Sequence, residues 1–170
     1  FKAVAYIIPG MTPEGGHSGD TRIWGKSFCN WEEIKEMHES GLIDIQSHSM
    51  YHHTIPVTNR VVDFVRQERT SPYTESYLAY FHDDKEDRRK SFVPAYGTPI
   101  YEGKSRFDKY PAFRDSPNVR ASCVEYVEKS GGVDYFKSPA WRHRLKELIT
   151  ETRQRDPAFS FETKAEQQSA

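Results

Sequence analysis

Two histidines four residues apart carry the strongest chemical signal in the sequence. His48 and His52 lie in the stretch 46–53, which reads QSHSMYHH. Residues i and i+4 of a single helical turn project from the same face, so both imidazoles can approach one divalent cation. A borderline ion such as Zn²⁺ suits two neutral imidazole nitrogens. The pattern therefore predicts a metal site at His48 and His52, with a histidine-rich surface loop as the alternative.

The residues before this pair predict the strands that would position it. Residues 2–9 form a mostly apolar run closed by a Pro-Gly pair, which is typical of a buried strand in a parallel sheet. Residues 42–47 form a second short run with alternating β-branched residues, which predicts another strand. His48 follows this second strand directly. It is therefore expected at a carboxyl end, where parallel sheets gather their functional residues.

The segment between the two strands predicts a helix. Asn30 can cap its start, and Glu33 stands at the capping-box position three residues later. Trp31, Ile34 and Met37 place one apolar stripe along it. The helix is expected to end at a glycine in position 41, which suits a left-handed stop. Strand, helix and strand in this order indicate a β-α-β unit with a right-handed crossover.

The remainder of the chain divides into a weakly patterned stretch and two helices. Residues 57–117 predict an insertion with irregular structure, apart from an apolar run at 61–65 that is compatible with a strand. Residues 116–132 and 138–155 each begin with a Ser-Pro pair, as helix starts often do, and both predict helices. The predicted parts are residues 1–56, 57–117 and 118–170.

The charge balance narrows the classes of partner. The chain has 170 residues, with 24 basic and 25 acidic side chains and a formal net charge of -1. This balance provides no long-range attraction to nucleic acid or acidic membranes, so a nucleic-acid partner is disfavoured. No apolar run approaches the ~20 residues of a membrane-spanning helix. The sequence therefore predicts no transmembrane segment.

The histidine pair and its surroundings resemble a known family. Residues 44–52 (DIQSHSMYH), preceded by residues 31–37 (WEEIKEM) and by Ser40-Gly41, are similar to the second signature of polysaccharide deacetylases, carbohydrate esterase family four. Residues 1–9 resemble the strand that precedes this helix in the family. The resemblance covers about residues 1–56, where helix, strand and histidine pair agree in order and spacing. From residue 61 onward the chain resembles an insertion of some bacterial members.

The resemblance implies a fold, a reaction and a cofactor. The implied fold is α/β, a partial (β/α) barrel-like deacetylase fold with a long irregular insertion and C-terminal helices. The implied reaction is metal-dependent deacetylation of an N- or O-acetylated polysaccharide, with a divalent metal, Zn²⁺ by preference, held by His48 and His52. In the family an aspartate completes the metal site, a second aspartate acts as base and a later histidine as acid. Family members commonly work at or beyond the cell surface, which implies a periplasmic or extracellular location.

The other family signatures do not match. The aspartate pair of the first signature belongs on a strand before Phe1, and Asp83-Asp84 is interpreted as solvated surface. Residues 94–97 (PAYG) lack the arginine of the third signature. We therefore expect the chain to be a portion of a deacetylase, or a degenerate relative, with little hydrolase activity alone.

Because these family signatures do not match, two alternative functions stay open, and self-association of the chain is also expected. The first alternative is a non-catalytic module that uses the same scaffold to bind glycans or proteins. The second is an unrelated α/β protein whose histidine pair is accidental. A missing first strand would also leave an unpaired sheet edge, which invites homo-oligomerisation.

Overall fold

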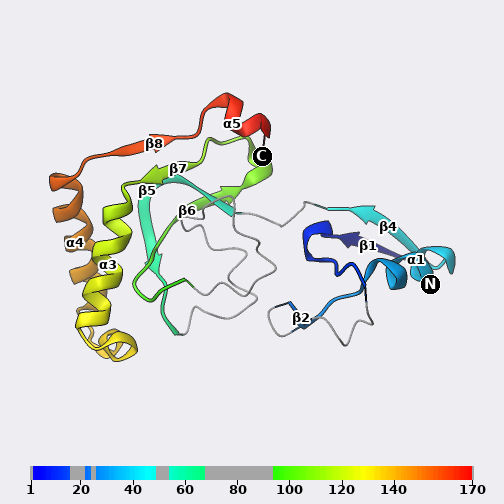
Figure 1. Cartoon of the computed structure of the whole chain (residues 1–170), viewed down its shortest axis with the longest axis horizontal. Coiled ribbons are helices and arrows are strands. Elements are labelled where there is room, and N and C mark those ends of the chain that lie inside the picture. Colours follow the sequence, from blue (N-terminus) through cyan, green and yellow to red (C-terminus); the bar gives the residue numbers. More distant parts are fainter. Residues whose placement is uncertain (1, 16–21, 24–25, 49–53, 68–93, 170) are drawn as a thin grey trace. The chain divides into compact units, whose positions relative to one another are not determined.

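The structure, a computed structural model, describes residues 2–15, 22–23, 26–48, 54–67 and 94–169. The described elements fall into two compact units, one within residues 2–48 and the other within residues 54–169 (Figure 1). The elements of the N-terminal unit are β1 (Ala3–Ile7), the 3-10 turn η1 (Pro9–Met11), β2 (Arg22–Ile23), β3 (Lys26–Ser27), α1 (Trp31–Glu39) and β4 (Ile43–Ser47). The elements of the C-terminal unit are β5 (Thr54–Phe64), β6 (Pro99–Ser105), η3 (Arg106–Asp108), β7 (Phe113–Asp115), α3 (Pro117–Lys129), η4 (Gly132–Lys137), α4 (Trp141–Arg155), β8 (Phe159–Phe161) and α5 (Lys164–Ser169).

A parallel β-α-β unit organises the N-terminal unit, as the sequence predicts. β1 pairs in parallel with β4, in a register that runs from Ala3 opposite Ile43 to Ile7 opposite Ser47. α1 connects them and packs against β4. Two adjacent parallel strands need such a crossover connection, because a tight turn between them would make them antiparallel. Both strands therefore present their carboxyl ends at the same edge.

The ends of α1 also follow the sequence prediction. Asn30 Oδ1 accepts the backbone N–H of Glu33 at 2.8 Å, and Glu33 Oε2 accepts the backbone N–H of Asn30 at 2.9 Å. This capping box satisfies two donors that the first helical turn leaves open. Beyond the helix, Gly41 has a φ of 68°. The chain can then turn into β4 without the penalty that a Cβ atom brings in the left-handed region.

The exposure of β1 differs from the sequence prediction. Val4 is 54% exposed and Tyr6 is 65% exposed, so the strand is confirmed but its burial is not. Burial of a parallel strand requires cover on both faces. Among the described residues, α1 packs on β4 and no further strand extends the β1–β4 pair. The apolar character of β1 thus exceeds what its two-stranded sheet buries.

The C-terminal unit is built around the packed helices α3 and α4. A buried cluster at these helices contains one strand residue and six helix residues: Phe64, Val119, Cys123, Val127, Leu145, Leu148 and Ile149. The helix positions recur at the spacing of one helical face, which confirms that the two predicted helices exist. α3 begins at the predicted Ser-Pro pair, whereas α4 begins at Trp141 and not at the predicted start at residue 138, because a turn over residues 138–140 precedes it. Gly97, with a φ of 88°, lies so close to α3 that a Cβ atom there would be 2.8 Å from Val127 Cγ2.

The stretch predicted to be irregular contains a long antiparallel pair. β5 and β6 pair from Thr54 opposite Ser105 to Phe64 opposite Pro99. The register shifts between Pro56 and Val61, where four residues of β5 face one residue of β6. Such a bulge breaks the alternation that a sequence pattern relies on, which explains why the strand was not predicted in full. Residues 68–93 lie outside the described part.

A second antiparallel pair of strands in the C-terminal unit joins the chain before α3 to the chain after α4. β7 and β8 run antiparallel, with Phe113 opposite Phe161 and Asp115 opposite Phe159. Glu162 follows β8 and accepts from Arg106 at 2.5 Å on each of its two oxygens. The side chain of Glu162 is only 2% exposed, so this ion pair fastens the C-terminal segment to the unit.

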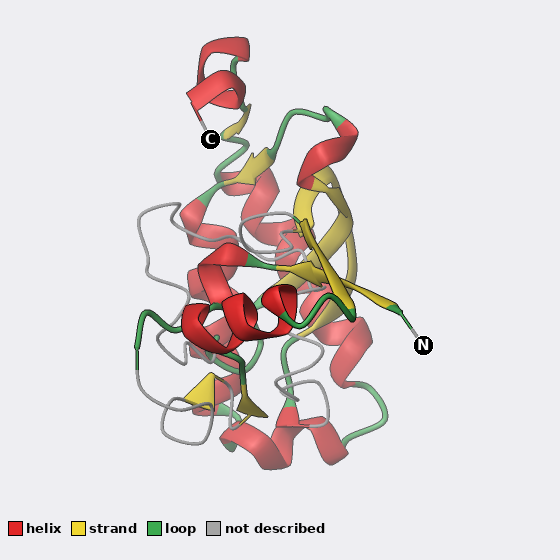
Figure 2. Ribbon diagram, turned by 90° about the vertical axis from the view of Figure 1, so that its right-hand side faces the viewer, coloured by secondary structure: helices red, strands yellow, loops and turns green. Residues whose placement is uncertain are grey.

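In the described residues the strands form four separate two-stranded sheets, without a closed barrel. Figure 2 shows these strands in yellow. The partial barrel therefore stays a prediction. No helix in this described part is both long and apolar enough to cross a membrane.

Candidate functional site

His48 lies at the carboxyl edge of the β1–β4 pair, where the sequence places it. Its backbone N–H donates to the carbonyl oxygen of Ile7 at 2.8 Å, which continues the parallel ladder by one bond beyond β4. Its exposed imidazole meets the ring of Tyr6 edge to face, with centroids 6.4 Å apart. The backbone of His48 is thus fixed by the sheet, while its ring lies on the surface at the strand ends.

The second predicted ligand, His52, lies outside the described residues, as does Asp83-Asp84. The structure therefore does not test whether the imidazoles of His48 and His52 lie close together. Among the residues that are described, no three His, Cys, Asp or Glu side chains lie close enough to hold a metal ion. The described part places the imidazole of His48, a possible metal ligand, at this edge, and the metal site of His48 and His52 stays a prediction.

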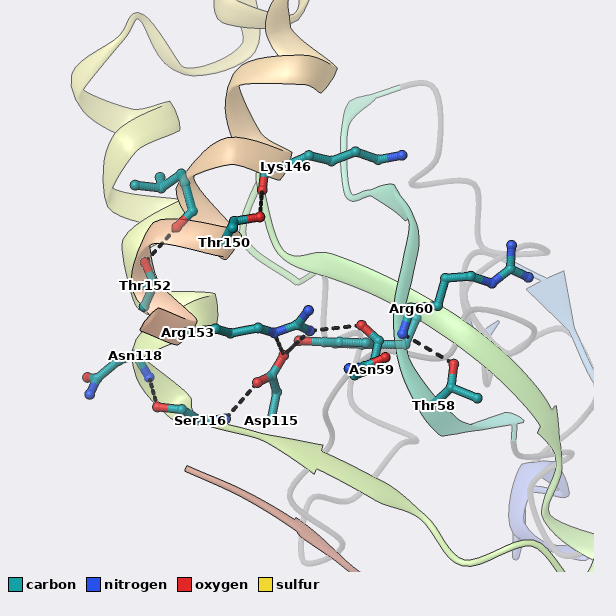
Figure 3. Close-up of polar contacts among 12 residues, drawn as sticks. Thr58, Asn59, Arg60, Asp115, Ser116, Asn118, Lys146, Thr150, Thr152 and Arg153 are labelled. Carbon is teal, nitrogen blue, oxygen red and sulfur yellow. Dashed lines mark hydrogen bonds and ion pairs between the residues drawn. The ribbon is translucent and has the colours of Figure 1, made fainter. Parts of the chain in front are cut away.

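A second group of polar side chains, which sequence reasoning missed, lies in the C-terminal unit (Figure 3). Asp115, on β7, accepts from Arg153 Nε at 3.1 Å and from Arg153 Nη2 at 2.5 Å. The same Asp115 oxygen accepts from the Tyr101 hydroxyl at 2.9 Å. Burial raises the pKa of Tyr101, and the negative charge of Asp115 raises it further. Tyr101 therefore acts here as a neutral donor.

Arg153 ties this group to β5. Its Nη2 also donates to the backbone carbonyl of Asn59 at 2.9 Å, inside the bulge. The side chain of Asp115 is 7% exposed and that of Arg153 is 29% exposed. A buried carboxylate needs such a partner, because an unpaired charge in a low-dielectric interior is costly. The pair thus joins β5, β7 and α4 at one point.

Ser116 links the start of α3 to the end of α4. Its hydroxyl oxygen accepts the backbone N–H of Asn118 at 3.1 Å, as an N-cap does, and the same hydroxyl donates to Asp156. Asn118 also donates to Asp156 at 2.7 Å. These hydrogen bonds, that from Ser116 first, lower the pKa of Asp156. The arrangement aligns the two helices and has a structural role.

A cavity of about 490 Å³ lies beside the Asp115–Arg153 pair. Its walls come from the β5 bulge (residues 57–59), from β7, from Arg153, and from residues 157–161. The lining is mostly apolar, with the rings of Phe113, Phe159 and Phe161 as its largest side chains. An apolar hollow of this size with a few converging polar groups is the usual form of a small-molecule site.

The sequence held a weak signal for this second group. Phe159-Ser160-Phe161 alternates as a half-buried strand does, and it stands directly after the Asp156-Pro157 helix stop. No spacing rule links Asp115 to Arg153, however, because their contact depends on the packing of α4 against β5 and β7. Two side chains 38 residues apart in sequence are paired only by the fold.

Comparison with known proteins finds no relative: no family model, curated protein or solved structure matches the chain. The resemblance to polysaccharide deacetylases therefore depends on the sequence itself, chiefly on residues 1–56.

Proposed function

We propose that the chain is a portion of a metal-dependent polysaccharide deacetylase, with His48 and His52 as metal ligands. The substrate would be a glycan that carries N- or O-linked acetyl groups. The observation that supports this proposal most strongly is the parallel β1–α1–β4 unit with His48 at its carboxyl edge. In parallel sheets that edge collects catalytic and ligand-binding groups, since the loops there converge from several strands.

The exposure of the strand pair supports a partial-barrel fold. A two-stranded parallel sheet is rare by itself, because parallel strands are normally covered on both faces. Val4 and Tyr6 of β1 are more than half exposed, and Leu42 before β4 is 57% exposed. These apolar side chains have the character of residues that face further layers of a larger sheet. The proposed barrel would supply those layers.

The histidines' proposed role is to hold the ion and fix its place. The hydrogen bond from His48 N–H to Ile7 fixes the backbone, so rotation of the side chain alone orients the ring. A bound divalent metal would polarise the acetyl carbonyl and lower the pKa of water. The sequence offers no match for the family's base, acid or third ligand. We therefore expect weak metal binding and little hydrolysis from this chain.

Titration calorimetry with Zn²⁺ tests the proposal. The His48→Ala and His52→Ala variants should each bind Zn²⁺ at least about tenfold more weakly than the parent chain, since each loses one of two protein ligands. His38→Ala is the matched control, because His38 is an exposed histidine of the same unit, near the end of α1. Equal affinity in the parent chain and both site variants would exclude the assignment.

A further inference from the structure

The bulge in β5 forms one wall of the cavity. Hydrogen bonds with β6 and α4 hold this bulge in place. Glu102, the single β6 residue opposite the bulge, accepts from Thr58 Oγ1 at 3.0 Å and from Arg60 at 2.6 and 3.2 Å. Arg153 holds the carbonyl oxygen of Asn59. Bulges often re-aim side chains next to functional sites. Here the bulge places Asn59 in the cavity wall.

Two side chains of this wall, those of Asn59 and Arg153, can form further hydrogen bonds. Over the described ranges, the side-chain amide of Asn59 and Nη1 of Arg153 make no hydrogen bond within the chain. The Asn59 amide offers two donors and an acceptor, and Nη1 offers donors. Both residues line the cavity, so these groups are available to a ligand there.

Three phenylalanine side chains form the apolar part of the cavity wall. The Phe113 centroid lies 6.1 Å from that of Phe159 and 5.5 Å from that of Phe161, and the last two are 6.1 Å apart. Phe159 is 66% exposed and Phe161 47% exposed, whereas Phe113 is buried. Two exposed rings against a buried third form an apolar wall that a ligand can cover, gaining the free energy of removing that surface from water.

The charge balance and the polar groups of the cavity disfavour both charged ligands and wholly apolar ligands. Arg153 is neutralised by Asp115 at 2.5 Å, so an anion finds no net positive charge and a cation no net negative charge. A wholly apolar ligand would strip water from Asn59 and Arg153 without replacing its hydrogen bonds. The remaining class is a neutral ligand with one apolar face and hydrogen-bonding groups at its rim.

We propose that this cavity binds a single pyranose ring of a neutral glycan. The C–H face of the ring would stack on Phe159 and Phe161, and its hydroxyl groups would bond to Asn59 and to Nη1 of Arg153. The choice of a glycan over other neutral polar ligands rests on the proposed function. The cavity would give the chain a glycan-holding subsite that needs no metal.

Binding of defined oligosaccharides to the whole chain tests this inference. The probes are the tetramers of β-1,4-linked N-acetylglucosamine, glucose, acetylated xylose and mannose, titrated in EDTA and followed by NMR shifts. At least one tetramer should bind. Phe159→Ala, Phe161→Ala and Asn59→Ala should each weaken that binding about tenfold, the loss expected when one stacking or bonding group is removed.

Phe107→Ala is the matched control, because Phe107 is 70% exposed and does not line the cavity. It should leave glycan affinity unchanged. The inference is overturned if none of the four tetramers shifts any resonance at 10 mM, a concentration about tenfold above a 1 mM Kd. It is also overturned if the phenylalanine variants bind as the parent does. Loss of a parent dimer in Phe159→Ala would identify the face as a self-interface instead.

The result is separable from that of the deacetylase proposal. His48→Ala and His52→Ala should bind the oligosaccharide as the parent chain does, since the metal is absent throughout. Glycan binding together with unchanged Zn²⁺ affinity in the histidine variants would retain the subsite and exclude the deacetylase assignment. Zn²⁺ binding at the histidines without any glycan binding would do the reverse.

Discussion

Arg153 donates two hydrogen bonds to one oxygen of Asp115, at 2.5 and 3.1 Å, and a third to the carbonyl oxygen of Asn59 at 2.9 Å. One guanidinium thereby joins α4 to β7 and to the β5 bulge. Replacement by Arg153→Met keeps much of the side-chain length but leaves the Asp115 carboxylate buried without its counter-charge. We expect the free energy of unfolding to fall by about 2–4 kcal/mol in urea denaturation.

The control for this prediction is Arg155→Met on the same helix. Arg155 is exposed, and its Nε bonds only to a backbone carbonyl, at 3.3 Å. Its replacement should change stability by less than about 0.5 kcal/mol. Similar losses in the two variants would contradict the structural role of the Asp115–Arg153 pair.

Acid should weaken the attachment of the C-terminal segment through Glu162. The hydrogen bonds from Arg106 hold the pKa of this carboxyl below its ordinary value, against the opposing effect of burial. The unfolded chain therefore takes up the proton first as the pH falls. The stability gained from the pair is complete above the ordinary pKa of about 4.3 and is lost as the pH falls through the folded pKa.

The measurable consequence is a change of slope. Between about pH 5 and pH 3, the unfolding free energy of Glu162→Gln should depend less on pH than that of the parent chain. Exposed Glu128 provides the control, and Glu128→Gln should keep the parent slope. An unchanged slope in Glu162→Gln would show that the pair does not couple protonation to folding.

Ser116→Ala should destabilise the helix pair by about 1–2 kcal/mol, since it removes both the α3 cap and the hydrogen bond to Asp156. The loss should be smaller when Asp156 is already replaced by alanine, because the two residues share one interaction. Thermal unfolding of the two single variants and the double variant measures this coupling. Ser130→Ala, at an exposed position after the same helix, should be nearly neutral. Strictly additive losses would refute the link.

Two glycines separate backbone strain from steric overlap. Gly131 has a φ of 107° and open space around it, so Gly131→Ala should cost only the strain of the left-handed region, about 1–2 kcal/mol. In Gly97→Ala the new methyl group would also meet Val127 Cγ2 at 2.8 Å and the Cys123 carbonyl at 2.9 Å. We expect a further loss of about 1–3 kcal/mol in melting experiments. Equal losses would mean that the turn at Gly97 can move away from α3.

The sequence predicted best where local chemistry determines the structure. The capping box of Asn30 and Glu33, the left-handed Gly41 and the two helices after Ser116 and Ser138 all follow from neighbouring residues. The parallel pairing of β1 with β4 follows from the helix between them. Each of these features needs information from only a few consecutive positions.

The sequence predicted least where distant segments meet. The β5 bulge removes the period of two that identifies a strand, and its shape depends on Glu102 and Arg153, far along the chain. The cavity beside Asp115 likewise forms only when α4, β7 and β8 pack together. No local pattern encodes such contacts, so this candidate site emerged from the fold.

The anomalous difference map of crystals of the whole chain grown with Zn²⁺, recorded at the zinc edge, tests the central claim most directly. The account predicts one peak about 2.0–2.1 Å from a ring nitrogen of His48 and from a ring nitrogen of His52. Imidazoles that point away from each other, with zinc elsewhere or absent, would contradict it.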